Sequence, residues 1–128
     1  MIAPVAAIAL VVILGLLAVF QIALIAGAPL GHFAWGGQDR ILPSRKRVGS
    51  VISIVLYGVI AGIALTRAGL IPGWSDALGI VVAMWVVFAY FAAGILLNAI
   101  SRSIPERAVM TPTVAVLAVL ALLVALGL

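Results

Sequence analysis

Long runs of apolar residues alternate with short polar stretches along the whole chain. Four of these runs are long enough to cross a bilayer, which takes about 20 mainly apolar residues in a helix. They cover residues 2–26, 48–66, 75–100 and 111–128. Backbone polar groups in lipid must find partners within the protein, which favours helices over isolated strands. We therefore predict an all-α membrane protein, a single transmembrane domain (1–128) with four helices in an up-down bundle.

Polar residues at the ends of the apolar runs indicate where two of the helices begin. Ser75 is placed to cap the third helix, with Asp76 favourably located in its first turn. Thr111 followed by Pro112 predicts the start of the fourth helix, because proline suits the first helical position.

Basic residues are divided unequally between the two sides of this expected bundle. The connections 27–47 and 101–110 share one side and hold six of the seven Lys and Arg residues, whereas Arg67 is alone on the other side. Since Lys and Arg accumulate in cytoplasmic loops, both long connections are expected to be cytoplasmic and both termini outside. Three consecutive basic residues are expected to contact anionic lipid headgroups, each contributing about 1 kcal/mol: Arg45, Lys46 and Arg47.

Composition agrees with a membrane location and excludes several classes of function. Only 8% of residues are charged and 67% are hydrophobic, against about a quarter charged in soluble domains. The charges behind the net value of +4 are few and bracketed by apolar segments, so no nucleic-acid partner is expected. The chain lacks cysteine, and His32 is its only histidine. We therefore expect no metal site, no cofactor and no catalytic residue.

The first half of the connection 27–47 has a composition that a merely solvated loop does not require. Glycines, the single histidine and two aromatic residues are concentrated there. We expect this stretch to return to the membrane interface beside the other cytoplasmic connection. The pairing forms a candidate ligand or partner site, whose residues are Gly27, Pro29, Gly31, His32, Trp35, Gly36, Gly37, Asn98, Glu106 and Arg107. Its glycines do not match the spacing of a phosphate-binding loop.

The second predicted helix has a small and polar face. Ser50, Ser53 and Tyr57 recur at helical spacing, and Gly58 and Gly62 lie alongside. Small residues and hydroxyls favour close helix packing in membranes, so a packing seam is the first interpretation. A ligand or ion path is the alternative. Aromatic residues of the third helix, Trp85, Phe88 and Phe91, indicate buried packing or a site for a flat apolar ligand such as a quinone.

Short motifs in and beside both cytoplasmic connections carry a family resemblance. They are Gly27-Ala28-Pro29 with Gly31, Gly36-Gly37, Leu42-Pro43 with Arg47 and Ser50, Asn98 with Ile100-Ser101, Ser103, Glu106-Arg107 and Pro112. On these residues the chain resembles an uncharacterised family of small four-helix integral membrane proteins of bacteria. The resemblance implies a bacterial inner-membrane location and brings no activity with it.

Few reactive groups and many small residues favour a non-enzymatic protein that acts through helix–helix and lipid contacts. Such a protein would be a homo-oligomer or an accessory subunit of a larger membrane complex. A small oligomeric facilitator or channel is one alternative, with a path formed by Ser50, Ser53, Tyr57, Gln21 and Asn98. A lipid- or quinone-binding membrane protein is another. A proton-driven transporter is disfavoured, because no ionisable residue lies in the middle of a predicted helix.

Overall fold

The computed structural model covers all 128 residues and contains helices but no strands. Its α-helices are α1 (Ile2–Ile25), α2 (Ser44–Arg67), α3 (Leu78–Ala99) and α4 (Ile104–Leu126). Two 3-10 helices, η1 (Gly31–Phe33) and η2 (Trp35–Gly37), lie in the connection between α1 and α2. All four α-helices are long and apolar enough to cross a membrane. The expectation of an all-helical, multi-pass membrane protein is therefore confirmed.

The fourth helix begins earlier than the apolar run predicted. Thr111 was expected to cap it, but α4 starts at Ile104 and is capped by Ser103, whose hydroxyl accepts a hydrogen bond from the Glu106 N–H (3.5 Å). A proline in the first turn suits this start, since that turn needs no backbone donor. Pro112 consequently lies inside the helix rather than at its beginning.

Two further helix starts also differ from the prediction. Helix α2 begins at Ser44, directly after Pro43, so that the three basic residues predicted in the loop form its first turn. Helix α3 begins at Leu78, and Ser75 does not cap it. The acidic residue expected in the first turn of α3, Asp76, instead pairs with Arg67 across the connection (3.2 Å).

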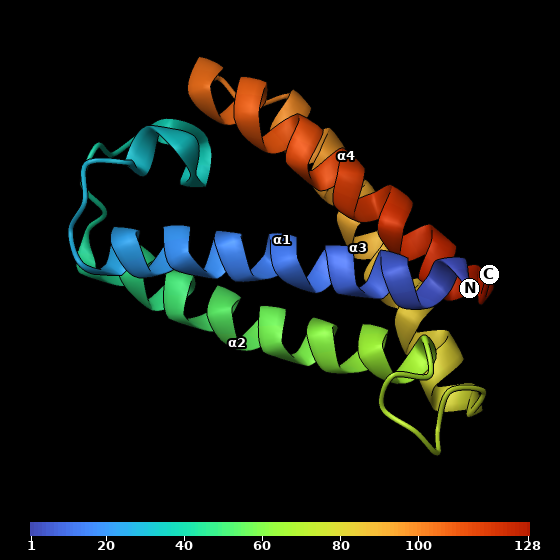
Figure 1. Cartoon of the computed structure of the whole chain (residues 1–128). Helices are drawn as coiled ribbons and strands as arrows, with labels where there is room; N and C mark the ends of the chain where they lie inside the picture. The colour runs from blue at the N-terminus through green and yellow to red at the C-terminus, as the bar shows by residue number, and fades with distance from the viewer.

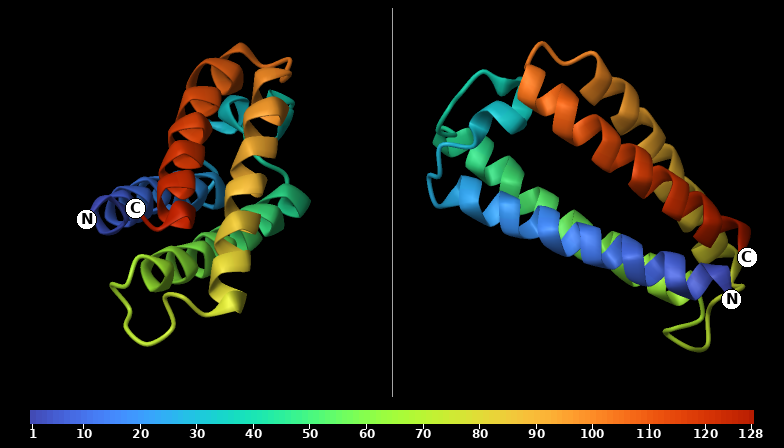
Figure 2. Two further views of the ribbon diagram at one scale, coloured as in Figure 1. Left: turned by 90° about the vertical axis from the view of Figure 1, so that its right-hand side faces the viewer. Right: turned by 45° about the horizontal axis from the view of Figure 1, so that its top comes forward.

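The helices are arranged as two pairs that form a V. Helix α1 lies beside α2 and α3 lies beside α4, and the two pairs converge at the end of the molecule that carries both chain termini (Figures 1 and 2). The backbone N–H of Ile2 donates to the carbonyl of Leu128 there (3.2 Å). At the opposite end the pairs diverge, and η1 and η2 lie between them (Figure 1).

The buried core occupies the converging end. Large side chains with at most 2% exposure, including Leu10, Met84 and Leu117, meet alanines that are completely buried, among them Ala7 and Ala121. Small residues let the helix backbones approach closely. The core therefore closes this end of the V and leaves the other end to be filled by the connection between α1 and α2.

A single arginine ties the ends of α2 and α4 together. The Arg67 guanidinium donates to the carbonyls of Ala125 (3.2 Å) and Ser75 (3.3 Å). Both helices end beside this group, where unpaired carbonyls favour a positive charge. Arg67 thus stabilises the apex of the V.

Candidate functional site

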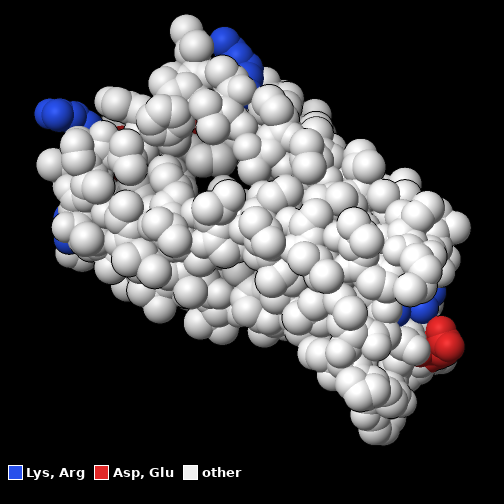
Figure 3. Space-filling model, viewed as in Figure 1, with Lys and Arg blue, Asp and Glu red and all other residues white.

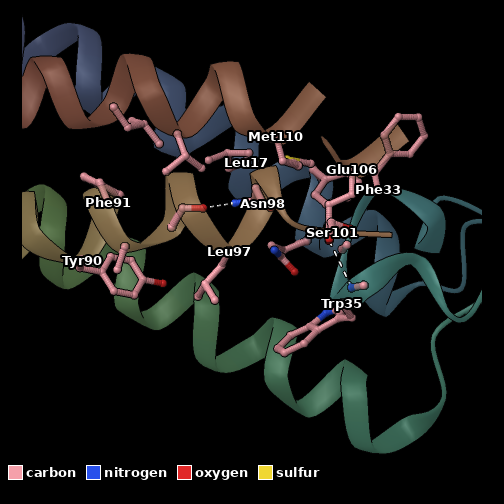
Figure 4. Close-up of a pocket in the computed structure, with 18 of the residues that line it drawn as sticks. Leu17, Phe33, Trp35, Tyr90, Phe91, Leu97, Asn98, Ser101, Glu106 and Met110 are labelled. Atoms are coloured by element: carbon pink, nitrogen blue, oxygen red, sulfur yellow. Dashed lines mark hydrogen bonds between the residues drawn. The ribbon is translucent and has the colours of Figure 1, made fainter. Parts of the chain in front are cut away.

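A cavity of about 570 Å³ lies between the diverging ends of the two helix pairs. Its wall is mainly apolar and includes Leu17 from α1, Phe91 and Leu97 from α3, and Met110 from α4 (Figure 4). The space-filling view shows the molecular surface hollowed between α1 and α4 (Figure 3). Both the volume and the apolar lining are typical of pockets that take small molecules.

Residues 31–37, here called the lid, form one wall of the cavity. Phe33, Trp35 and Gly36 line it from this side (Figure 4). Two hydrogen bonds fasten the lid to the start of α4. The Gly36 N–H donates to Oε2 of Glu106 (3.3 Å), and the Ser103 hydroxyl donates to the carbonyl of His32.

The glycines of the lid are required by its close approach to α4 and to its own flanking chain. Gly36 and Gly37 have φ of 74° and 70°, in the left-handed region that favours glycine. A Cβ on Gly37 would lie 2.3 Å from Cβ of Ser103, and one on Gly31 would lie 1.8 Å from the carbonyl oxygen of Asp39. A side chain at either position would push the lid out of its present place against α4 and residue 39.

Trp35 is held in an unfavourable backbone conformation by its contact with α2. Its φ is 54°, which costs a residue with a side chain about 1–2 kcal/mol. The indole ring lies against Gly49, where a Cβ would come within 2.7 Å of the ring. Because Gly49 has no side chain, the indole ring can lie directly against α2.

Several polar groups at the cavity wall have acceptor atoms that the chain does not use. Gln21 donates through Nε2 to the Tyr57 hydroxyl (3.3 Å), and its Oε1 is buried without a partner. Asn98 donates to the carbonyl of Gly94 (2.8 Å), which leaves its oxygen unused. Glu106 is only 7% exposed and accepts from the lid. No Lys, Arg or His nitrogen lies within 4.0 Å of the Glu106 carboxylate.

The candidate site residues predicted from the sequence fall into two groups. The cavity wall contains Trp35, Gly36, Asn98 and Glu106. The remaining six lie around it: Gly27, Pro29, Gly31, His32, Gly37 and Arg107.

These surrounding residues support the lid and the loops rather than line the cavity. His32 is exposed, and its Nδ1 lies 3.1 Å from the carbonyl of Gly37. Arg107 donates to the carbonyl of Ser101 (3.2 Å). Gly27, two residues before the exposed Pro29, packs beside Arg47, where a Cβ would lie 3.4 Å from the guanidinium. The histidine and arginine thus stiffen the two connections.

Sequence reasoning missed most of the apolar wall. Leu17, Phe20, Gly94 and Met110 line the cavity, but nothing distinguishes them from other apolar residues of their helices. Phe91 belongs to the aromatic face recognised in the sequence, and it is buried at the cavity wall. That face and Asn98 were the signals in the sequence for this side of the cavity.

The predicted polar face of α2 does not line a continuous path in one chain. Tyr57 reaches the cavity, but Ser50 is fully buried elsewhere and the Ser53 hydroxyl donates to the Gly49 carbonyl (3.0 Å). A Cβ on Gly58 or Gly62 would meet no atom within 4 Å. These two glycines therefore bring no other helix of the same chain into close contact.

Basic side chains gather near the lid. Figure 3 shows Lys and Arg at the open end of the V, with a smaller charged group at the opposite end. Lys46 forms a salt bridge with Asp39 (2.5 Å), and Arg47 donates to the carbonyl of Leu42 (2.7 Å). Arg45 is exposed.

No family model matches the sequence, and comparisons with curated proteins and with solved structures found no match. The resemblance to a bacterial family therefore stays a prediction. The four apolar helices that it implies are present.

Proposed function

We propose that this multi-pass membrane protein binds a small amphipathic molecule in the cavity between its two helix pairs. The observation that carries the proposal is the mainly apolar cavity of about 570 Å³, closed on one side by the lid. The lid keeps a strained residue, Trp35, at the cavity wall. Such strain persists at sites where the surrounding structure over-determines it, and these sites are often functional.

Binding fits the arrangement better than conduction through a single chain. The core fills the converging end of the V with side chains such as Leu10, Met84 and Leu117. A cavity that is closed at this end can hold a molecule, but it offers no route for the molecule across the membrane. The two serines of the expected path also lie outside the cavity wall.

Self-association is a second candidate role, and the outward glycines of α2 favour it. Gly58 and Gly62 lie on one helix face with open space at their Cβ positions. Glycines spaced in this way allow helices of separate chains to pack closely in membranes. A homo-oligomer built on this face would leave the cavity of each chain intact.

The orientation expected from the sequence completes the proposal. The open end of the V, with its lid and basic residues, faces the cytoplasm of a bacterial cell, and both termini face outward. Six of the seven basic residues support this orientation. Arg45 then lies at the level of anionic headgroups, where a positive charge is stabilised.

Tryptophan fluorescence tests the proposal directly. In a chain with Trp74 and Trp85 replaced by Phe, Trp35 reports from the cavity wall. We expect brominated single-chain amphiphiles to quench it saturably in detergent. A matched control retains only Trp74, which is 67% exposed in the connection at the other end. Quenching of Trp35 that rises without saturation, as it should for Trp74, would rule out binding in the cavity.

A further inference from the structure

The buried carboxylate of Glu106 indicates what kind of head group the cavity recognises. Glu106 presents a carboxylate with room for about four hydrogen bonds but accepts only one, from Gly36 at 3.3 Å. Its side chain is buried beside the lid and has no cationic partner within 4.0 Å. A positively charged partner would stabilise a carboxylate that is buried without one, because nothing else offsets the free-energy cost of removing it from water.

A second side chain of the cavity wall has an unpaired acceptor atom. Gln21 is 8% exposed, and its Oε1 has no hydrogen-bond partner. One of its two amide N–H groups donates to Tyr57, and the atom without any partner is an acceptor. Buried polar atoms in folded proteins are nearly always paired. That oxygen is itself completely buried, so the Glu106 carboxylate remains the acceptor that faces a bound molecule.

The charge of Glu106 determines which head group the cavity wall favours. Asn98 donates one of its two amide N–H groups to Gly94, and the Gly36 N–H donates to Glu106. The head of a quinone offers carbonyl acceptors but no positive charge to pair with this carboxylate. A protonated primary amine offers three N–H donors and a positive charge, and it matches the wall.

An apolar groove gives the rest of such a molecule a way into the surrounding lipid. The groove lies between α1 and α4 and has a volume of about 520 Å³. Leu17, Phe20 and Met110 line both the groove and the cavity, so the two spaces adjoin. Pro112 on the groove wall withholds one backbone hydrogen bond from α4, which weakens the helix at this point.

We infer that the cavity binds an amphiphile with a protonated primary amine, with the amine at Glu106 and the apolar chain in the groove between α1 and α4. This inference rests on the proposed binding function and adds the chemistry of the head group. An aminophospholipid such as phosphatidylethanolamine and a free long-chain amine share this chemistry.

Amphiphiles with one brominated chain and different heads test the inference in the protein that retains only Trp35. We expect the primary amine to bind roughly ten- to a hundredfold more tightly than the alcohol, as for a hydrogen bond to a charged group. The carboxylate is expected to bind most weakly. Equal binding of all three, or tightest binding of the carboxylate, overturns the inference and leaves the proposed function standing. No saturable quenching by any of them overturns both.

Two variants locate the effect at the carboxylate. Glu106→Gln keeps an acceptor for Gly36 but removes the charge, and we expect it to abolish the preference for the amine. Asp39→Asn makes the same change on a carboxylate that pairs with Lys46, and the preference should remain. An unchanged preference in Glu106→Gln overturns the inference. Should that variant fail to fold, the ranking of heads in the parent chain decides alone.

Brominated phospholipids distinguish the two sources of the amine. Tighter binding of phosphatidylethanolamine than of the free amine identifies a membrane lipid, and the reverse identifies a free amine. Phosphatidylcholine has the same charge but no N–H donor. If phosphatidylcholine binds as tightly as phosphatidylethanolamine, the inference is overturned.

Discussion

A single added methyl group on the lid should disrupt its contact with the start of α4. In Gly37→Ala the new Cβ would lie 2.3 Å from Cβ of Ser103, so the lid must move by about 1 Å to reach normal contact. That shift breaks the bond from Ser103 to His32 and takes the 3.3 Å bond from Gly36 to Glu106 beyond hydrogen-bonding distance. Losing a neutral and a charge-assisted bond costs about 2–4 kcal/mol.

Gly36→Ala is the matched control for this change. Gly36 and Gly37 have nearly the same positive φ, so both variants carry a similar backbone strain of about 1–2 kcal/mol. A Cβ on Gly36 meets no atom within 4 Å, and alanine keeps the N–H that bonds to Glu106. The two variants therefore differ mainly in the collision with Ser103. At the lower limit of 2 kcal/mol, the lid should be open roughly thirtyfold more often in Gly37→Ala.

A thiol beneath the lid measures how often it opens. The chain has no cysteine, and Ser101, which is 8% exposed at the cavity wall, can be replaced by Cys in both variants. Maleimide labelling then follows the open population when opening and closing are fast. We expect labelling roughly thirtyfold faster with Gly37→Ala than with Gly36→Ala. Equal rates would refute the steric argument.

Removing the colliding atom provides a second check. Ser103→Gly eliminates the Cβ, while glycine costs only a few tenths of a kcal/mol at a helix cap. In this background the two alanine variants should label at the same rate. A persistent difference would mean that Gly37 acts through something other than its contact with Ser103.

Three further predictions address the apex of the V, the outward face of α2 and the orientation. Arg67→Ala should lower the free energy of unfolding in detergent by about 2–3 kcal/mol, because the Ala125 carbonyl and a loop carbonyl lose a charged donor. Asp76→Ala should change it by less than about 0.5 kcal/mol, since that side chain is 93% exposed. Gly58→Ala should raise the free energy of unfolding of one chain by up to about 1 kcal/mol. If the parent protein can be cross-linked as a dimer and Gly58→Ala cannot, this face joins two chains. An impermeant thiol reagent applied to intact cells should label Cys at Asp76 and not at Arg45, and the reverse pattern would refute the orientation.

The helices were predictable because their signal is local. A run of apolar side chains is enough to specify a membrane helix, and all four appeared where such runs lie. The start of α4 was missed for the same reason. Glu106 and Arg107 interrupt the apolar run, although Ser103 and Pro105 supply a cap and a first turn before them. Hydropathy locates the lipid-buried part of a helix, and capping residues determine where the helix begins.

The lid was only partly predictable, because its structure depends on contacts between distant segments. The excess of glycines before Gln38 indicated a stretch folded against something, and its position beside Asn98 and Glu106 was an expectation. The atoms in contact could not be inferred, since Gly37 and Ser103 meet only when α4 is in place. The cavity was unpredictable because an empty volume depends on how far the helix pairs diverge.

The lid and the buried alanines together explain why a cavity exists at all. Ala7, Ala64 and Ala121 are completely buried and draw the helices together at one end. At the other end, the ring of Trp35 lies against α2 while its neighbour Gly36 bonds to α4, so the lid lies across both helix pairs. The lid therefore acts as a spacer as well as a cover. Shortening Trp35 to Ala should then let the pairs approach and reduce the volume for a ligand, whereas a simple cover would leave the cavity larger and more open.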